Sequence, residues 1–202
     1  MASIYAIKPA FQNLLRPLCQ WLAERGVTAN QVTIAALLLS LITGGGLAFF
    51  YTQPCVFLLI PVVLFVRMAL NAIDGMLARE HDMKSELGAI LNELCDVIAD
   101  VALYLPFALL AGVWAWLVVL VVIIAIVTEM TGVIAIQIGA SRRYDGPMGK
   151  SDRAFVFGAV ALVLGLGVNA GQWLNGLFVV MLVLTVWTVF NRARHALAEI
   201  GQ

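Results

Sequence analysis

The chain has 202 residues, of which 62% are hydrophobic and 12% are charged, and its formal net charge at pH 7 is zero. Soluble globular domains usually carry about 25% charged residues, so this composition excludes a soluble globule and indicates a protein that has the bilayer as its solvent. A nucleic-acid partner is not expected, because the balanced charge offers no basic footprint to phosphate groups. Since long apolar segments cross a bilayer as helices, we expect an all-α integral membrane protein.

Residues 3–25 form the first predicted element, which is amphipathic rather than membrane-spanning. Apolar side chains recur there at helical spacing, and Lys8, Gln12 and Arg16 lie between them. A helix with this pattern lies in the membrane interface with its apolar face toward the lipid. Its two prolines could break or kink it. The segment also lacks the short apolar core of a signal peptide.

Six apolar segments are predicted to cross the membrane after this interfacial helix. A span needs about 20 apolar residues, and the fifth segment is short by that measure. The predicted limits are 32–51, 56–78, 88–110, 114–139, 154–169 and 173–190. Thr28 or Asn30 is expected to cap the first span. We interpret residues 1–202 as a single membrane-embedded domain.

The basic residues predict the orientation of these spans. Eleven of the twelve Lys and Arg lie in the N-terminal segment, the 79–87 turn, the 140–153 loop or the C-terminal tail. The turns between the other ends of the spans have none. The positive-inside rule therefore places both termini in the cytoplasm.

The polar stretch from Asn71 to Asp96 concentrates polar side chains at fixed spacing. It reads NAIDGMLAREHDMKSELGAILNELCD. Asn71 and Asp74 are three residues apart, and Gly88, Asn92 and Asp96 follow one another at intervals of four. Residues three or four apart share a helical face, so the stretch predicts two helix faces that oppose each other across a short turn.

The residue types in this stretch indicate metal-assisted phosphoryl chemistry. Carboxylates and amide carbonyls are suitable ligands for Mg²⁺ or Mn²⁺, which are hard cations. Such an ion neutralises charge on a diphosphate leaving group, and a nearby carboxylate can take a proton from an attacking hydroxyl. Gly75, Ala78 and Gly88 have little or no side chain, so a nucleotide could approach the backbone closely. We interpret the stretch as a site at the cytoplasmic interface for a lipid-sized substrate.

The same stretch resembles the signature of the CDP-alcohol phosphotransferase family, which reads Asp-x2-Asp-Gly-x2-Ala-Arg-x8-Gly-x3-Asp-x3-Asp. The residues that match it in type and spacing are Asp74, Gly75, Ala78, Arg79, Gly88 and Asp96. Asn71 and Asn92 stand where the family has its first and third Asp. In length and layout the chain is similar to small bacterial inner-membrane members of that family.

The resemblance implies roles for these residues. Asp74 and Asp96 would be the catalytic residues and the anionic metal ligands, and Asp96 would also be the base. Asn71 and Asn92 would be neutral ligands or hydrogen-bond partners of the metal site. The residues implied to hold the cytidine diphosphate are Gly75, Ala78, Arg79 and Gly88. The resemblance further implies Mg²⁺ or Mn²⁺ as the cofactor and a homodimer as the assembly.

The loop 140–153 is a second informative stretch, because it gathers four cations, Arg142, Arg143, Lys150 and Arg153. It is either ordinary positive-inside charge or an anion site for a lipid or acceptor phosphate. Members of the family place basic residues for a phosphorylated acceptor in this region. Further along, the tail is predicted to be a membrane-surface anchor through Arg192, Arg194 and His195.

Four charged residues outside the signature lie within apolar spans, namely Arg67, Glu93, Asp100 and Glu129. A charge inside the membrane costs at least about 2.5 kcal/mol on insertion scales, so such residues usually face a cavity or pair with one another. Spacing places Arg67 and Asp100 on the faces of the signature. The alternatives are that these residues flank the site or that Arg67 pairs with Glu129, Glu93 or Asp100.

Three functional hypotheses follow. The first is a phosphatidyltransferase that moves the phosphatidyl group of a CDP-linked lipid, which the resemblance implies to be CDP-diacylglycerol, to an alcohol acceptor with release of CMP. The second is a catalytically inactive CDP-lipid-binding relative or scaffold, which the two Asn would explain. The third is a small membrane transporter. The sequence does not name the alcohol.

Overall fold

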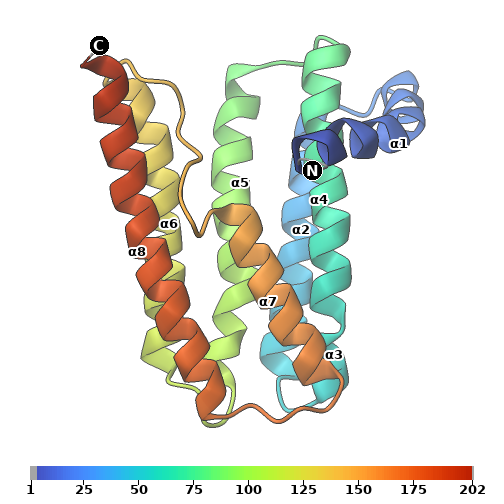
Figure 1. Cartoon of the computed structure of the whole chain (residues 1–202). Helices are drawn as coiled ribbons and strands as arrows, with labels where there is room; N and C mark the ends of the chain where they lie inside the picture. Colours follow the sequence, from blue (N-terminus) through green and yellow to red (C-terminus); the bar gives the residue numbers. More distant parts are fainter. Residues whose placement is uncertain (1–3, 202) are drawn as a thin grey trace. The chain divides into compact units, whose positions relative to one another are not determined.

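The structure is a computed structural model that describes residues 4–201, so position 3 of the predicted interfacial helix lies outside the described residues. Within that part of the chain every regular element is a helix (Figure 1). The elements are α1 (Ile4–Glu24), α2 (Ala29–Phe49), α3 (Pro54–Phe57), α4 (Leu59–Glu80), α5 (Glu86–Tyr104), the 3₁₀ helix η1 (Leu105–Leu109), α6 (Ala115–Gln137), α7 (Lys150–Gly165) and α8 (Gln172–Ile200).

Four helical segments of the described chain are long and apolar enough to cross a membrane, judged by length and composition. They are Ala29–Phe49, Pro54–Glu80, Ala115–Gln137 and Gln172–Ile200. Helices α5 and α7 lie where the third and fifth spans were predicted. Helix α7 has only 16 residues, and α5 carries four acidic residues among its 19. The prediction of an all-helical membrane protein is therefore confirmed, with four rather than six helices meeting this criterion.

The predicted span limits differ from the helices at three places, each for a local reason. Helix α5 ends at Tyr104 rather than 110, because Pro106 lacks the N–H that an α-helix needs and restricts the residue before it. Helix α7 begins at Lys150, so the end of the predicted loop is the first helical turn. Helix α8 runs on to Ile200, so the basic tail is helical as well.

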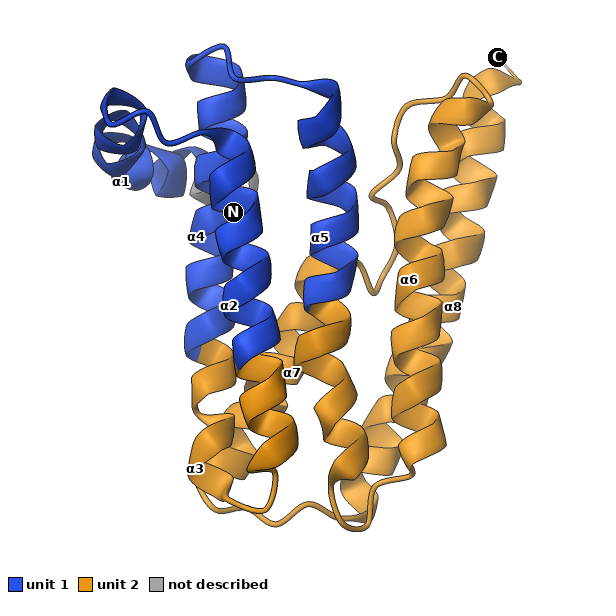
Figure 2. Cartoon of the chain, turned by 180° about the vertical axis from the view of Figure 1, so that it is seen from behind, with its two compact units in different colours: residues 1–42, 62–99 blue, residues 43–61, 100–202 orange. Residues whose placement is uncertain are grey.

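The chain divides into two compact units, which Figure 2 shows in blue and orange. Unit 1 comprises Met1–Ile42 and Val62–Ala99, and unit 2 comprises Thr43–Pro61 and Asp100–Gln202. Helices α2, α4 and α5 each contribute residues to both units.

Unit 1 has a core formed by α1, α2 and α4. Cys19 of α1 packs there with Val32 of α2 and Met76 of α4, all of them buried. Both prolines lie inside α1, which continues through them as one helix. Its other face exposes apolar side chains, as Leu14 shows at 75% exposure. This exposed apolar face is what the predicted interfacial helix requires.

The start of α2 in unit 1 carries a reciprocal cap. The Thr28 hydroxyl accepts a hydrogen bond from the Gln31 backbone N–H over 3.3 Å, and the Gln31 side chain accepts one from the Thr28 N–H over 3.0 Å. This arrangement is a capping box, which satisfies two donors at a helix start. Of the two residues predicted to cap the first span, Thr28 is the one that does so.

Unit 2 has an aromatic core. The Tyr104 and Phe157 rings are stacked with their centroids 4.1 Å apart, and Phe107 and Phe178 pack against the same Phe157 ring. A Cβ atom at Gly44 would collide with the Ala102 backbone, so this glycine allows α2 and α5 to approach closely. Figure 1 shows α6 and α8 side by side in this unit.

Candidate active site

A pocket of about 700 Å³ lies in unit 1, at the start of α2, the end of α4, the start of α5 and the turn that joins α4 to α5. That volume is in the range of small-molecule sites. Seven of the eight signature positions line it, namely Asn71, Asp74, Gly75, Ala78, Arg79, Gly88 and Asn92. The two helix faces predicted from spacing therefore do border one cavity.

Asp74 is the carboxylate that both lines the pocket and is buried, with 6% of its surface exposed. Its Oδ2 atom accepts a hydrogen bond of 2.9 Å from the Thr33 hydroxyl. The same hydroxyl lies 3.1 Å from the Ala29 carbonyl oxygen one turn earlier in α2. Helix α2 thus holds the Asp74 carboxylate, which lines a cavity large enough for a ligand.

Asp96 is the signature position that does not line the pocket. Its Oδ1 atom accepts a hydrogen bond of 3.0 Å from the Asn71 side-chain nitrogen and forms an ion pair of 3.4 Å with Arg67. Arg67 also donates to the Asp96 backbone oxygen over 2.9 Å. Asp96 was not among the partners that the sequence suggested for Arg67. Asn71 lines the pocket and touches Asp96, so it connects the carboxylate to the cavity.

Two glycines of the signature lie close to polar side chains. A Cβ atom at Gly88 would lie 2.7 Å from the Asn30 side-chain oxygen, so a larger residue there would displace the Asn30 side chain. A Cβ atom at Gly75 would lie 3.2 Å from the Arg79 guanidinium. Gly75 therefore leaves room for the Arg79 head group beside the pocket.

The turn between α4 and α5 contributes pocket residues that sequence reasoning missed. Lys84 and Ser85 both line the cavity, and the Ser85 hydroxyl accepts a hydrogen bond of 3.0 Å from the Gly88 N–H. The sequence offered one signal for Lys84, which is its position in the spacer between Arg79 and Gly88. In the sequence this lysine is one of the basic residues that orient the spans. It adds a second cation to a cavity suited to phosphate groups.

The donor set around the pocket suits a divalent ion whose coordination is completed by its substrate. The described residues contain no group of three or more His, Cys, Asp or Glu that could hold a metal by themselves. Asp74 offers carboxylate oxygens, and the amides of Asn71 and Asn92 line the same cavity. Hard oxygen donors of this kind fit Mg²⁺ or Mn²⁺, and Mg²⁺ is commonly bound by one or two carboxylates together with substrate phosphates.

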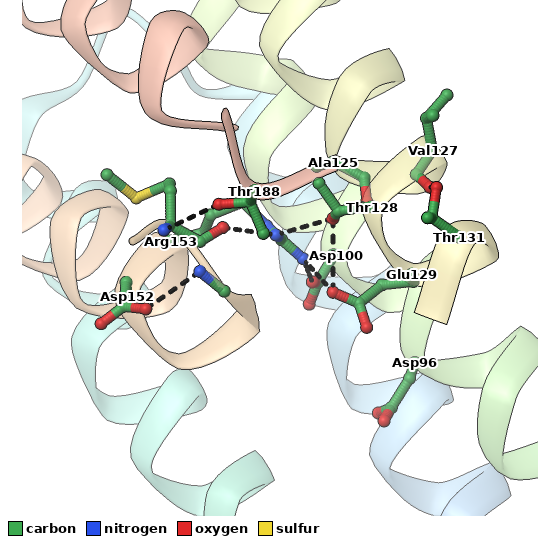
Figure 3. Close-up of polar contacts among 12 residues, drawn as sticks. Asp96, Asp100, Ala125, Val127, Thr128, Glu129, Thr131, Asp152, Arg153 and Thr188 are labelled. Carbon is green, nitrogen blue, oxygen red and sulfur yellow. Dashed lines mark hydrogen bonds and ion pairs between the residues drawn. The ribbon is translucent and has the colours of Figure 1, made fainter. Parts of the chain in front are cut away.

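Unit 2 contains a second concentration of charge, which is buried. Arg153 is fully buried, and its Nη2 atom lies 2.8 Å from Glu129 Oε1 and 3.8 Å from Asp100 Oδ2. Its Nη1 atom donates to the Thr128 hydroxyl and the Met148 backbone oxygen. Figure 3 shows the Arg153 guanidinium pointing toward these groups. Arg153 was predicted to bind substrate, and the structure places it inside this ion-pair cluster.

Glu129 is the centre of that cluster. Besides Arg153, it pairs with Arg192 over 3.3 Å and with Arg142 over 3.8 Å. Arg192 is 1% exposed and donates to the Thr128 backbone oxygen over 2.5 Å. The prediction that Arg192 anchors the chain at the membrane surface is therefore wrong. Its position near the C-terminus suggested a solvated tail, but α8 continues far enough to place this side chain against α6.

The remaining basic residues of the predicted loop lie nearer the surface of unit 2. Arg143 pairs with Asp145 over 2.8 Å and with Glu199 over 2.8 Å, and Lys150 is partly buried in the first turn of α7. Burial raises the pKa of Asp145, but hydrogen bonds and charge from Arg143 outweigh it and hold that pKa below its usual value. The predicted loop cations thus lie in one unit, where Arg142, Arg143 and Arg153 pair with carboxylates.

Comparisons with known proteins identify the class to which this fold and this site belong. The sequence pattern of the family described as CDP-alcohol phosphatidyltransferase matches residues 26–190. The chain belongs to this CDP-alcohol phosphatidyltransferase family.

Similar relatives agree with that assignment. The chain is 51% identical over 195 residues to the inner membrane protein YnbA of Escherichia coli strain K12, covering 96% of each chain. It is 32% identical over 110 residues to archaetidylinositol phosphate synthase of Pyrococcus horikoshii, covering 54% of this chain and 55% of that one. The solved structure of phosphatidylinositol phosphate synthase from Mycobacterium tuberculosis, with CDP-DAG bound, shares the fold with a TM-score of 0.69 and 21% identity, covering 91% of this chain and 92% of that one.

Proposed function

We propose that this protein is a phosphatidyltransferase that uses CDP-diacylglycerol. It would transfer the phosphatidyl group to an alcohol acceptor and release CMP, as a step of phospholipid biosynthesis. The observation that carries the proposal is the unit 1 pocket, where the signature residues of α4 and α5 meet around one cavity of nucleotide size. The structural relative from Mycobacterium tuberculosis has CDP-DAG bound.

The pocket residues suggest how the donor would bind. The small residues Gly75, Ala78 and Gly88 leave space for the cytidine diphosphate, and Arg79 and Lys84 supply positive charge for its phosphates. Asp74, with the amides of Asn71 and Asn92, would hold Mg²⁺ or Mn²⁺. When bound, such an ion neutralises charge on the diphosphate and on the departing CMP.

The transfer itself exchanges one phosphoester bond for another. The acceptor hydroxyl oxygen attacks the phosphorus that carries the diacylglycerol, and the bond from that phosphorus to the bridging oxygen of the diphosphate breaks. CMP leaves with that oxygen. Asp96 takes the proton of the attacking hydroxyl as a general base. Asn71 and Arg67 orient Asp96 for this role through the contacts to its Oδ1 atom.

The placement in the cell is part of the same proposal. We place the protein in the inner membrane, as the printed name of the Escherichia coli relative states for that protein. Helices α5 and α7 would cross together with the four longer spans, which gives six crossings and keeps both termini and the pocket on the cytoplasmic side. We also retain the homodimer that the family resemblance implies.

The acceptor is the open part of this function. The basic segment of unit 2 is proposed to contribute to acceptor or lipid-phosphate binding through Arg142, Arg143, Lys150 and Arg153. Arg142 lies 3.8 Å from Glu129 and over the Tyr144 ring. Arg153 instead has short contacts to Glu129 and Thr128, so we expect it to support binding through structure.

The decisive experiment supplies the purified protein with CDP-diacylglycerol, Mg²⁺ and a polar-metabolite extract. New lipids are identified by mass and CMP is quantified. We expect CMP release that depends on an acceptor and stops in excess chelator. Full turnover in excess chelator would refute the metal assignment.

A catalytically inactive CDP-lipid-binding relative is the second candidate. The amides at Asn71 and Asn92 favour it, because they remove two of the four carboxylates of the family signature. It predicts saturable CDP-diacylglycerol binding without CMP release under any acceptor. The third hypothesis is a transporter. It predicts neither CDP-diacylglycerol binding nor CMP release, and it requires that a solute cross the membrane of vesicles that contain the protein.

A further inference from the structure

Asp96 is held by two side chains of α4 that lie one helical turn apart, Arg67 and Asn71. The Asn71 Nδ2 atom donates to Asp96 Oδ1 over 3.0 Å. An Arg67 Nη2 atom lies 3.4 Å from the same oxygen and 2.9 Å from the Asp96 backbone oxygen. All three residues belong to unit 1. The Asp96 carboxylate therefore has a cation and a neutral donor against one oxygen before any substrate binds.

The contacts of Asn71 and Arg67 with Asp96 both stabilise the ionised Asp96 carboxylate. A carboxylate in place of the Asn71 amide would put a second anion about 3 Å from Asp96 Oδ1, and the two would repel. The amide nitrogen converts that repulsion into a hydrogen bond. Arg67 is 3% exposed, and a buried guanidinium within an apolar helix is costly unless it is paired. The Asp96 carboxylate is a partner that offsets this cost.

The arrangement also changes what a divalent ion meets at Asp96. An ion that approaches this carboxylate is repelled by the guanidinium only a few ångströms away, inside a protein where such charges are weakly screened. Asp74 lines the cavity, where a ligand can reach it, and Asp96 does not. The two carboxylates of the signature therefore differ in their access to a bound ligand.

We propose that Arg67 is a positioning residue for Asp96 and a built-in cation that takes the place of a metal ion at this carboxylate. The nucleotide-free protein then binds Mn²⁺ weakly, and any stronger binding needs the substrate diphosphate. The catalytic meaning of this inference rests on the proposed phosphatidyl transfer. Its central statement concerns metal binding by the chain alone.

The test is a Mn²⁺ titration of nucleotide-free protein in detergent, followed by the EPR signal of free Mn²⁺. Arg67→Gln removes the charge and keeps a side-chain amide, so we expect Mn²⁺ affinity to rise about tenfold or more. Arg67→Lys keeps the charge and should bind Mn²⁺ as weakly as the natural protein. Arg16→Gln is the matched control, since it breaks a different ion pair of unit 1, the 3.2 Å pair with Glu80, and should change nothing.

A second arm asks whether Arg67 acts through Asp96. In an Asp96→Asn background, Arg67→Gln should no longer raise Mn²⁺ affinity. A folded Arg67→Gln protein with unchanged Mn²⁺ affinity, or the same rise without the Asp96 carboxylate, would overturn the inference. If Arg67→Gln does not fold, Arg67→Met is the second variant, because it also removes the charge and keeps a long unbranched side chain, and it should raise Mn²⁺ affinity to a similar extent. Failure of the natural protein to release CMP would sink the proposed function and leave this titration interpretable.

Discussion

Asp74 in unit 1 and Glu129 in unit 2 are both buried carboxylates in apolar helices, with 6% and 8% of their surfaces exposed. Their surroundings differ. Glu129 has three guanidinium partners, whereas Asp74 accepts from the Thr33 hydroxyl and borders a cavity. A carboxylate held among three arginines serves the fold, and one that lines a cavity lies where a ligand can contact it. Burial alone does not distinguish the two.

The largest effect should come from Asp96→Asn, which tests unit 1 as the place of chemistry. The variant cannot accept the proton of the acceptor hydroxyl, so we expect CMP release to fall by about 10²–10⁴-fold. The protein should still insert and fold. Glu24→Gln, which changes an exposed carboxylate of α1, is the control and should keep full activity. Near-normal CMP release by a well-folded Asp96→Asn protein would move the base elsewhere, with Glu93 and Asp100 next to be tested.

The next largest effect is expected for Glu129→Gln and concerns stability. This variant tests whether the ion-pair cluster of unit 2 serves the fold. Removing this charge leaves Arg153 and Arg192 buried with one anionic partner fewer, so the free energy of unfolding should fall by about 3–5 kcal/mol. Denaturant unfolding in detergent measures it. Glu80→Gln breaks the exposed pair with Arg16 and should cost at most about 1 kcal/mol. Equal losses in the two variants would contradict the comparison.

A smaller effect separates the basic residues of unit 2 from one another. With an identified acceptor that bears a phosphate, Arg142→Ala and Lys150→Ala should raise the apparent KM for the acceptor by about tenfold, the loss expected from one charge-assisted contact. Their unfolding midpoints should change little. Arg153→Ala should instead lower the midpoint, because it opens the buried cluster. If Arg142, Arg143, Lys150 and Arg153 can each be replaced by Ala with normal kinetics, this segment only orients the spans.

The smallest effect concerns pH and the surface part of unit 2. Because Arg143 holds the pKa of Asp145 below its usual value, the Asp145 carboxylate stabilises the fold at pH values above its unfolded pKa. That contribution is lost as the pH falls through the lower folded pKa, in the region below about pH 4. The Asp145→Asn protein should therefore have a lower free energy of unfolding than the natural protein near pH 6. At the acid end of the range the two free energies should become equal. A constant stability difference across that range would contradict this assignment.

The sequence by itself determined the helical membrane class, the family and the signature residues that line most of the pocket wall from α4 and α5. These features depend on local properties, which are apolar length and the placement of residues three or four apart on one helical face. Asn71 and Asp74, and likewise Gly88 and Asn92, therefore reached a common cavity as predicted. The roles that the resemblance implies for them stay predictions until they are measured.

The partners of the charged residues were decided only by the tertiary structure. Residues 67 and 96 meet across two helices, and residues 129 and 192 meet across two others. Such contacts depend on how each helix is rotated about its own axis and on where it ends, neither of which helical spacing specifies. Arg192 is the clearest case, because a residue near the C-terminus became 1% exposed once α8 continued through the basic tail. Burial then selected its partner, since a guanidinium removed from water must find a carboxylate or carbonyl oxygen in the packed structure.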